Sequence, residues 1–170
     1  MPIEIKPVRA ADVEAIALLA REIWQSAYAG IISQDQIDYM LAQRYNSERL
    51  LAELAQTGLW WDQAFIDGER AGFCSCYLTD QSGEIKLDKV YVHPGRQRSG
   101  IGAALIERVL AHGRDHGCHT LVLAVNKQNA KAIVAYEKSG FLVREAVRVD
   151  IGGGFVMDDF IMTRSIPGAA

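Results

Sequence analysis

The sequence has few cysteines, no long apolar run and no excess of basic residues, and each shortage excludes a class of protein. Only three cysteines occur, Cys74, Cys76 and Cys118, and an odd number without a leader sequence argues against a disulfide framework. The N-terminal segment lacks a basic stretch followed by an apolar core. No apolar run approaches the ~20 residues that span a bilayer. We therefore expect a cytoplasmic protein that does not act at a membrane.

The charge balance and the histidine spacing argue against two further classes. Asp and Glu total 21 against 18 Lys and Arg, which gives a formal net charge of −3. Proteins that bind nucleic acid through bulk charge are basic, so we expect no nucleic-acid partner. His112 and His116 are one helical turn apart, but no glutamate follows His112 as in the zinc-binding helix of metalloproteases. We interpret this pair as a solvated helix face and expect no metal.

The hydrophobic pattern predicts a single domain over residues 1–170, a length typical of one domain. Short alternating or apolar runs predict strands, and apolar residues spaced three and four apart predict helices. The expected strands cover 3–8, 60–66, 71–78, 85–92, 120–125, 141–149 and 155–164, and the expected helices cover 11–29, 33–44, 47–56, 101–116 and 128–138.

Two of these segments carry more specific expectations. Ser33 and Gln36 form a capping-box pattern, in which Ser33 accepts from the backbone and Gln36 reaches back. The run from Thr120 to Val125 is apolar without interruption, which is typical of a strand buried on both faces. The mixture of hairpins and crossover helices predicts an α/β fold (α+β, with a mixed sheet) that carries helices on both faces.

The segment from Lys89 to Leu110 has the strongest local signal for function. A strand ends there, a loop rich in glycine and arginine follows, and a helix begins. The free N–H groups and the dipole of a helix N-terminus bind anions such as phosphate. Gly100 and Gly102 would let the anion approach the backbone closely. The alternative is a glycine-rich turn that only starts a helix.

Two better-known phosphate loops do not fit this segment. A P-loop requires a lysine followed by serine or threonine after its last glycine, and no lysine follows here. The dinucleotide-binding fingerprint requires a third glycine, and Leu105 occupies that position.

A second signal follows the apolar strand at 120–125. Asn129 and Tyr136 are seven residues apart, so on a helix they share nearly one face. Taken singly, Asn129 is also an ordinary helix N-cap and Tyr136 an ordinary packing residue. Their combination with the preceding loop favours a functional interpretation of both residues.

In chain order, these segments resemble the GCN5-related N-acetyltransferases, the GNAT superfamily. The resemblance rests on Val90-Tyr91-Val92-His93-Pro94, Gln97-x-x-Gly100-x-Gly102, Asn129, Tyr136 and Gly140-Phe141. It implies a twisted, mostly antiparallel sheet whose central strands splay apart, and a single N-acetyltransferase domain over residues 1–170. It also implies that acetyl-CoA is the co-substrate and that the amine attacks it directly in a ternary complex.

The resemblance also implies roles for particular residues. Those implied to bind the cofactor are Val90, Tyr91, Val92, Gln97, Arg98, Ser99, Gly100, Ile101, Gly102, Ala103, Asn129 and Tyr136. Tyr136 would in addition protonate the leaving thiolate as general acid. Asp88 occupies the position near the start of the cofactor strand where many relatives carry glutamate, and it is the candidate general base. Tyr28, Glu84, Asp158 or an ordered water are the alternatives for the base.

The segments 28–33, 36–41 and 157–162 resemble the bacterial branch that includes spermine/spermidine N-acetyltransferases. This resemblance implies a small-molecule amine as partner, with a polyamine as the leading choice. An N-terminal amine or another small amine remains an alternative acceptor, and a non-catalytic CoA-binding sensor is a further alternative. Relatives that pair through their C-terminal strands imply a homodimer.

Overall fold

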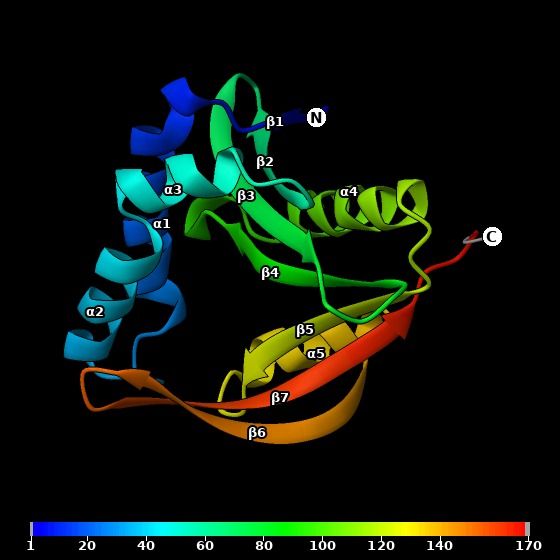
Figure 1. The fold of residues 1–170 in the computed structure, drawn as a ribbon. Coiled ribbons are helices and arrows are strands. Elements are labelled where there is room, and N and C mark those ends of the chain that lie inside the picture. Colours follow the sequence, from blue (N-terminus) through cyan, green and yellow to red (C-terminus); the bar gives the residue numbers. More distant parts are fainter. Residues whose placement is uncertain (1, 169–170) are drawn as a thin grey trace.

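The computed structural model describes residues 2–168. Its seven strands form one sheet in the order β1-β2-β3-β4-β5-β7-β6 (Figure 1). The strands are β1 (Ile3–Pro7), β2 (Leu59–Ile66), β3 (Glu69–Leu78), β4 (Glu84–Val92), β5 (Thr120–Asn126), β6 (Leu142–Gly152) and β7 (Phe155–Ser165). The helices are α1 (Val13–Ala27), α2 (Gln34–Arg44), α3 (Ser47–Leu54), α4 (Ile101–Asp115) and α5 (Ala130–Lys138), with short 3₁₀ turns η1 (Ala10–Asp12) and η2 (Pro94–Arg96). All neighbouring strands are antiparallel except β4 and β5.

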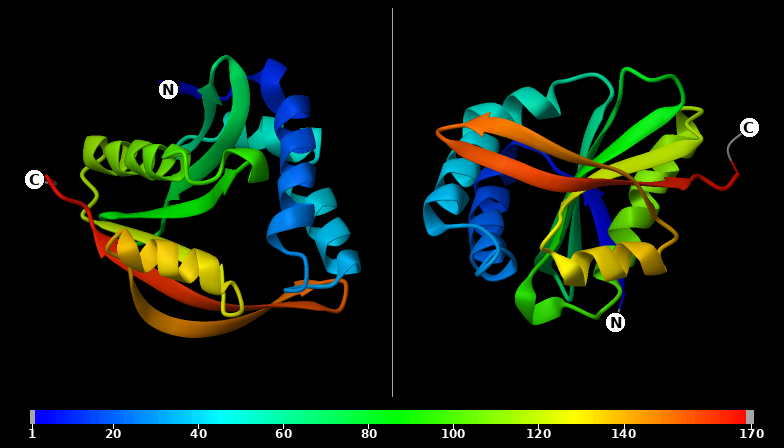
Figure 2. Two further views of the ribbon diagram at one scale, coloured as in Figure 1. Left: turned by 180° about the vertical axis from the view of Figure 1, so that it is seen from behind. Right: turned by 90° about the horizontal axis from the view of Figure 1, so that it is seen from below.

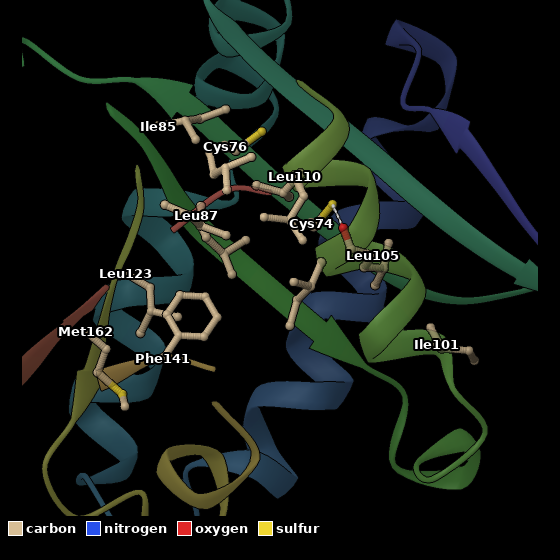
Figure 3. Close-up of a cluster of buried hydrophobic side chains, with 14 of the residues drawn as sticks. Cys74, Cys76, Ile85, Leu87, Ile101, Leu105, Leu110, Leu123, Phe141 and Met162 are labelled. Carbon is tan, nitrogen blue, oxygen red and sulfur yellow. Dashed lines mark hydrogen bonds between the residues drawn. The ribbon is translucent and has the colours of Figure 1, made fainter. Parts of the chain in front are cut away.

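Helices cover both faces of the sheet, as predicted. Figure 2 shows α4 and α5 on one face of the sheet and α1, α2 and α3 on the other. Side chains of α4 and α5 pack with one apolar core, and those of α1, α2 and α3 pack with a second core. Figure 3 shows the first core, in which Cys74 and Cys76 point from β3 toward α4 as free thiols. Among the described residues, no helix combines the length and the apolarity that a membrane crossing requires.

The parallel strands β4 and β5 separate part-way along their length. They pair only from Glu84 to Leu87 on β4 and from Thr120 to Leu123 on β5. Beyond these residues the two strands diverge, which confirms the predicted splay. The expectation that residues 120–125 are buried on both faces is wrong at Ala124, which is exposed. The reason is that the diverging strand leaves open space beside it.

A β-bulge at Asp88 changes which residues of β4 face which core. The register between β3 and β4 shifts by one there, so Asp88 has no partner residue on β3. As a result Leu87 and Val90 both pack in the α4 core. Lys89 turns to the other face, where its Nζ lies 5.1 Å from the centre of the Trp61 ring. Because a bulge inserts one extra residue, it reverses the alternation of side chains beyond it.

The β6–β7 hairpin is held against α2. Ser33 Oγ accepts from the backbone N–H of Gln36 at 3.1 Å, as the capping pattern predicts. The prediction that the Gln36 side chain reaches back is wrong, because its amide donates to the carbonyl of Val156 at 3.2 Å. The Tyr39 hydroxyl donates to the carbonyl of Ile151 at 3.0 Å. The second helix therefore fixes the turn between the last two strands.

A buried aspartate attaches α4 to β2. Asp62 lies 2.8 Å from His112 Nε2 and 3.3 Å from Arg108 Nε, and its side chain is 2% exposed. Trp60 stacks on the His112 ring at 4.8 Å. The interpretation of His112 as part of a solvated face is therefore wrong, because neighbours on β2 cover it. Within residues 2–168, no three His, Cys, Asp or Glu side chains are grouped as metal ligands.

Replacement of Asp62 by alanine should lower the free energy of unfolding by about 2 kcal/mol, because two donors on α4 lose a buried acceptor. Urea unfolding followed by circular dichroism measures this change. The control is Glu107→Ala, which removes the exposed ion pair with Arg114 and should change stability by less than about 0.5 kcal/mol. Equal losses in the two variants would contradict the special role of Asp62.

Candidate active site between the splayed strands

A cavity of about 700 Å³ occupies the gap between the diverging ends of β4 and β5. Its walls come from α1, β4, the loop before α4, the first turns of α4, the end of β5, and α5 with the residues before it. The cavity lining includes Asp88 and every residue predicted to bind the cofactor except Ser99 and Gly100. Residues far apart in the sequence are thus brought to one place by the separation of two strands.

The loop before α4 is shaped by two left-handed residues. Arg98 has φ +65° and Gly100 has φ +87°, and α4 begins directly after Gly100. Ser99 turns away from the cavity and donates its hydroxyl to the carbonyl of Arg96. The first intrahelical bond runs from the N–H of Ala104 to the carbonyl of Gly100. The N–H groups of the three helical residues before Ala104 have no acceptor inside the helix and remain available for a ligand.

Positive groups surround this helix N-terminus. Arg98 is exposed, whereas Arg96 lies 3.0 Å from a carboxylate oxygen of Glu69. Lys131 of α5 donates to the side-chain oxygen of Gln97 at 3.0 Å, which ties the loop to the neighbouring helix. The helix dipole adds partial positive charge at the same place. The loop can therefore hold a doubly charged anion such as a diphosphate.

The free edge of β4 provides the middle of the site. Beyond Leu87, the backbone groups on the β5 side of β4 have no strand partner among residues 2–168. An extended ligand that carries amide groups can hydrogen-bond to such an edge like an added strand. Val90 and Val92 pack toward α4 and Tyr91 packs toward α1, so the backbone between them borders the gap.

Asn129 and Tyr136 both line the cavity, as their spacing predicts. The Asn129 side-chain oxygen caps α5 by accepting from the N–H of Ala132 at 3.3 Å. The Tyr136 ring packs edge-on against Phe141, with ring centres 5.6 Å apart. Burial raises the pKa of Tyr136 well above its ordinary value. At neutral pH this phenol therefore keeps its proton and can donate it.

Asp88 lines the cavity at the bulge of β4. Its carboxylate contacts the buried ammonium of Lys89, whose side chain is 2% exposed. Burial alone would raise the pKa of Asp88, but the positive charges of Lys89, Arg44 and Lys86 lower it below its ordinary value. Asp88 is therefore an anion at neutral pH and a weak proton acceptor.

The α1 wall of the cavity was not assigned from the sequence. Tyr28, proposed there only as an alternative base, lines the cavity and its hydroxyl lies 2.8 Å from the hydroxyl of Tyr91. The other α1-side residues in the lining are Ile23, Ser26, Ala27 and Ile31. The amphipathic pattern of α1 shows which face is buried, but no motif shows that its last turn borders a ligand site.

The other two alternatives for the base lie outside the cavity lining. Glu84 sits at the start of β4, where it accepts from the Thr79 hydroxyl at 3.0 Å and lies 3.4 Å from Arg144. Asp158 forms an ion pair with Lys127 at 2.7 Å. Both carboxylates therefore already have partners away from the gap.

Comparisons with known proteins agree with this geometry. The profile of the Acetyltransferase (GNAT) family matches residues 18–141. The spermidine N(1)-acetyltransferase of Thermoplasma acidophilum is 29% identical over 162 residues, which cover 93% of this chain and 97% of that protein. The crystal structure of the PaiA N-acetyltransferase of Thermoplasma acidophilum in complex with coenzyme A superposes with a TM-score of 0.83 at 28% identity, covering 97% of this chain and 99% of that one.

A more distant structure has the same fold. The ribosomal-protein-S18-alanine N-acetyltransferase of Escherichia coli aligns with a TM-score of 0.73 at 22% identity, covering 99% of this chain and 97% of that one. The family match begins within α1 and ends at Phe141, so it spans the cavity walls from α1 to α5. By this match, and as the motifs of the sequence predicted, the chain belongs to the GNAT family of acetyltransferases.

Proposed function

We propose that this protein transfers the acetyl group of acetyl-CoA to a primary amine of a small polyamine, by direct attack in a ternary complex. The observation that carries the proposal is the cavity between β4 and β5, whose lining includes the loop before α4, Tyr136 and Tyr28. One space therefore offers an anion site, a free strand edge and proton donors. This combination suits a direct transfer between two substrates that are bound together.

The residues present fit acetyl-CoA in three respects. The N-terminus of α4 with Arg98 suits the diphosphate. The unpaired edge of β4 suits the amide-containing arm. The volume of about 700 Å³ lies within the range typical of ligand pockets. Val90, Val92 and Asn129 would then border the arm that leads to the thioester.

The chemistry requires a neutral amine, a stabilised oxyanion and a protonated leaving group. Backbone N–H groups on the free edge of β4 would donate to the oxygen that becomes negative. Tyr136, which keeps its proton at neutral pH, would give it to the departing thiolate. Asp88 stays a candidate base, together with an ordered water, and its lowered pKa suits it better to attracting the ammonium form of the acceptor.

The choice of a polyamine as acceptor is supported by the similarity to the spermidine N(1)-acetyltransferase and by the carboxylate of Asp88 in the cavity. The main alternatives are another small amine, an N-terminal amine, and a sensor that binds CoA without turnover. Tyr136 favours an enzyme over a sensor, because binding alone does not need a proton donor near the thioester.

Turnover with an amine panel tests the proposal. Acetyl-CoA is mixed with spermidine, spermine, n-butylamine, an amino acid and an alanyl peptide, and thiol release is followed spectrophotometrically. We expect the highest kcat/KM with the two polyamines. Thermal stabilisation by CoA without thiol release from any amine would support the sensor instead. Preference for the peptide would support an N-terminal acetyltransferase.

Several finer expectations from the sequence stay predictions. These are the single domain over residues 1–170, the cytoplasmic location, and the absence of nucleic-acid and membrane partners. We also propose a homodimer, supported by the edge strand β6, which exposes Leu142, Val143 and Val149. Light scattering after size-exclusion chromatography measures the mass and decides this point.

A further inference from the structure

Asp159 of β7 is a buried carboxylate that lacks a partner. It is 5% exposed, and its Oδ1 is fully buried without a hydrogen-bond partner among residues 2–168. The other buried carboxylates are well paired: Asp12 with Arg70, Asp62 with His112, and Glu53 with the Trp61 indole. Because an unpaired buried charge is costly, such an exception points to a ligand that would satisfy it.

The strand register places Asp159 opposite the end of β5, whose residues Ala124 and Val125 line the cavity. It pairs with Asn126, the last residue of β5, and Ile161 pairs with Ala124. Directly opposite residues of antiparallel strands share a face, and so do alternate residues along one strand. Asp159 is therefore on the same face as Ala124, which lines the cavity. Phe160 turns to the opposite face, where it packs against the α4 core.

This face of the sheet is the one that α1 and α2 cover. Met157, two residues before Asp159, packs in the core of α1, α2 and α3. Burial raises the pKa of the Tyr28 hydroxyl at the end of α1. The negative charge of Asp159 also acts to raise it. Helix α4, which follows the loop at 97–100, packs on the opposite face. Asp159 lies outside the residues that line the cavity, so an acceptor that contacts it would enter the gap from the side of α1 and α2.

The charged groups around Asp159 do not neutralise it by contact. Its neighbours are Arg44 on α2, Lys86 on β4, Lys127 after β5 and the adjacent Asp158. Among the described residues, none of the three cations forms an ion pair with Asp159, whereas Lys127 pairs with Asp158. Burial raises the pKa of Asp159, and the distant cations only partly offset it. The Asp159 carboxylate can therefore form an ion pair with a cationic group of the substrate.

We propose that Asp159 binds an ammonium group of the acceptor other than the nitrogen that is acetylated. The reacting nitrogen must be neutral to attack the thioester, so the cation held by Asp159 is a second nitrogen of the same molecule. This inference rests on the proposed function and deepens it, because it makes Asp159 the residue that favours diamines and polyamines over monoamines.

Asp158 offers a matched control one residue away. Its side chain is 45% exposed, pairs with Lys127 and belongs to the opposite face of β7. Asp158→Asn and Asp159→Asn remove the same charge from neighbouring positions. The two variants therefore alter the long-range electrostatic field almost equally. Any difference between their effects on the acceptor must come from a direct contact.

The experiment compares spermidine with n-butylamine for the wild type and both variants. For Asp159→Asn we expect kcat/KM for spermidine to fall about tenfold, mainly through KM, and kcat/KM for n-butylamine to change less than about twofold. For Asp158→Asn both should stay within about twofold. Titration of spermidine into the protein saturated with CoA should show the same loss of affinity for Asp159→Asn only.

Three outcomes would overturn the inference: equal losses for the two amines, equal effects of the two variants, or unchanged spermidine binding in Asp159→Asn. The melting temperature separates contact from scaffolding, since an unpartnered carboxylate can be replaced by an amide without loss of stability. A large drop in melting temperature would make Asp159 structural. Failure of the wild type to acetylate any amine would instead refute the proposed function, while the binding titration would still test Asp159.

Discussion

Replacement of Tyr136 by phenylalanine is expected to lower kcat about 100-fold, the lower range of what a positioned proton donor contributes. The affinity for acetyl-CoA should change less than about twofold, because the phenylalanine ring keeps the edge-on contact with Phe141. The phenol carries its proton at neutral pH, because burial raises its pKa above the ordinary value. Single-turnover measurement of thiol release reports this step directly, and isothermal titration with CoA reports binding.

The control for this variant is Tyr77→Phe on β3, which removes a hydroxyl outside the cavity lining and should leave kcat unchanged. If Tyr136→Phe also kept the wild-type rate, the thiolate would take its proton from water, and Tyr136 would be only a wall of the site. If instead the affinity for CoA fell while the rate at saturation was kept, the hydroxyl would bind the cofactor. The ratio of the two effects therefore assigns the role.

The fold and the cofactor side of the site could be predicted because local patterns determine them. The helix over Ile101–Asp115 and the loop before it follow from glycine positions, apolar spacing and charge within one continuous segment. The same holds for Asn129 and Tyr136, whose spacing on one helix fixes their relation. Each of these inferences depends only on residues that are close together in the sequence.

The acceptor side could not be predicted because it depends on contacts between distant segments. The bulge at Asp88 is a property of the pairing between β3 and β4, and alternation in the sequence gives the wrong face for Lys89. The last turn of α1 borders the cavity only because β5 separates from β4 there. Asp159 stands beside Asp158 in the sequence, and only the register with β5 distinguishes the buried carboxylate from the exposed one.

The first turn of α4 contains Gly102, whose replacement by aspartate is expected to keep or raise the stability of the fold and to weaken the binding of CoA. Gly102→Asp places a carboxylate in the first turn of α4, where negative charge stabilises a helix by about 0.3–1 kcal/mol and removal of a glycine helps further. A Cβ at this position meets only Val92 Cγ2, at an ordinary 3.8 Å. The melting temperature should therefore stay the same or rise.

The same carboxylate would face the diphosphate, and two like charges about 4 Å apart near a protein surface repel by up to about 4 kcal/mol. We expect the Kd for CoA to rise about 100-fold in Gly102→Asp and much less in Gly102→Asn, which has the same shape without the charge. The difference between the two variants should shrink at high salt. Titration calorimetry at two ionic strengths measures all four values.

A comparison with S-acetylpantetheine, which lacks the diphosphate, separates this effect from a general disturbance of the site. Gly102→Asp should turn over this truncated substrate as the wild type does, provided the carboxylate acts only on the phosphates. If the turnover of both thioesters fell by the same factor, the N-terminus of α4 would not be the diphosphate site. Gly102 would then act by shaping the wall of the cavity, and the anion site would have to be sought at Arg98 and Lys131. A loss confined to acetyl-CoA ties the phosphates to the N-terminus of α4, at the gap between the splayed strands.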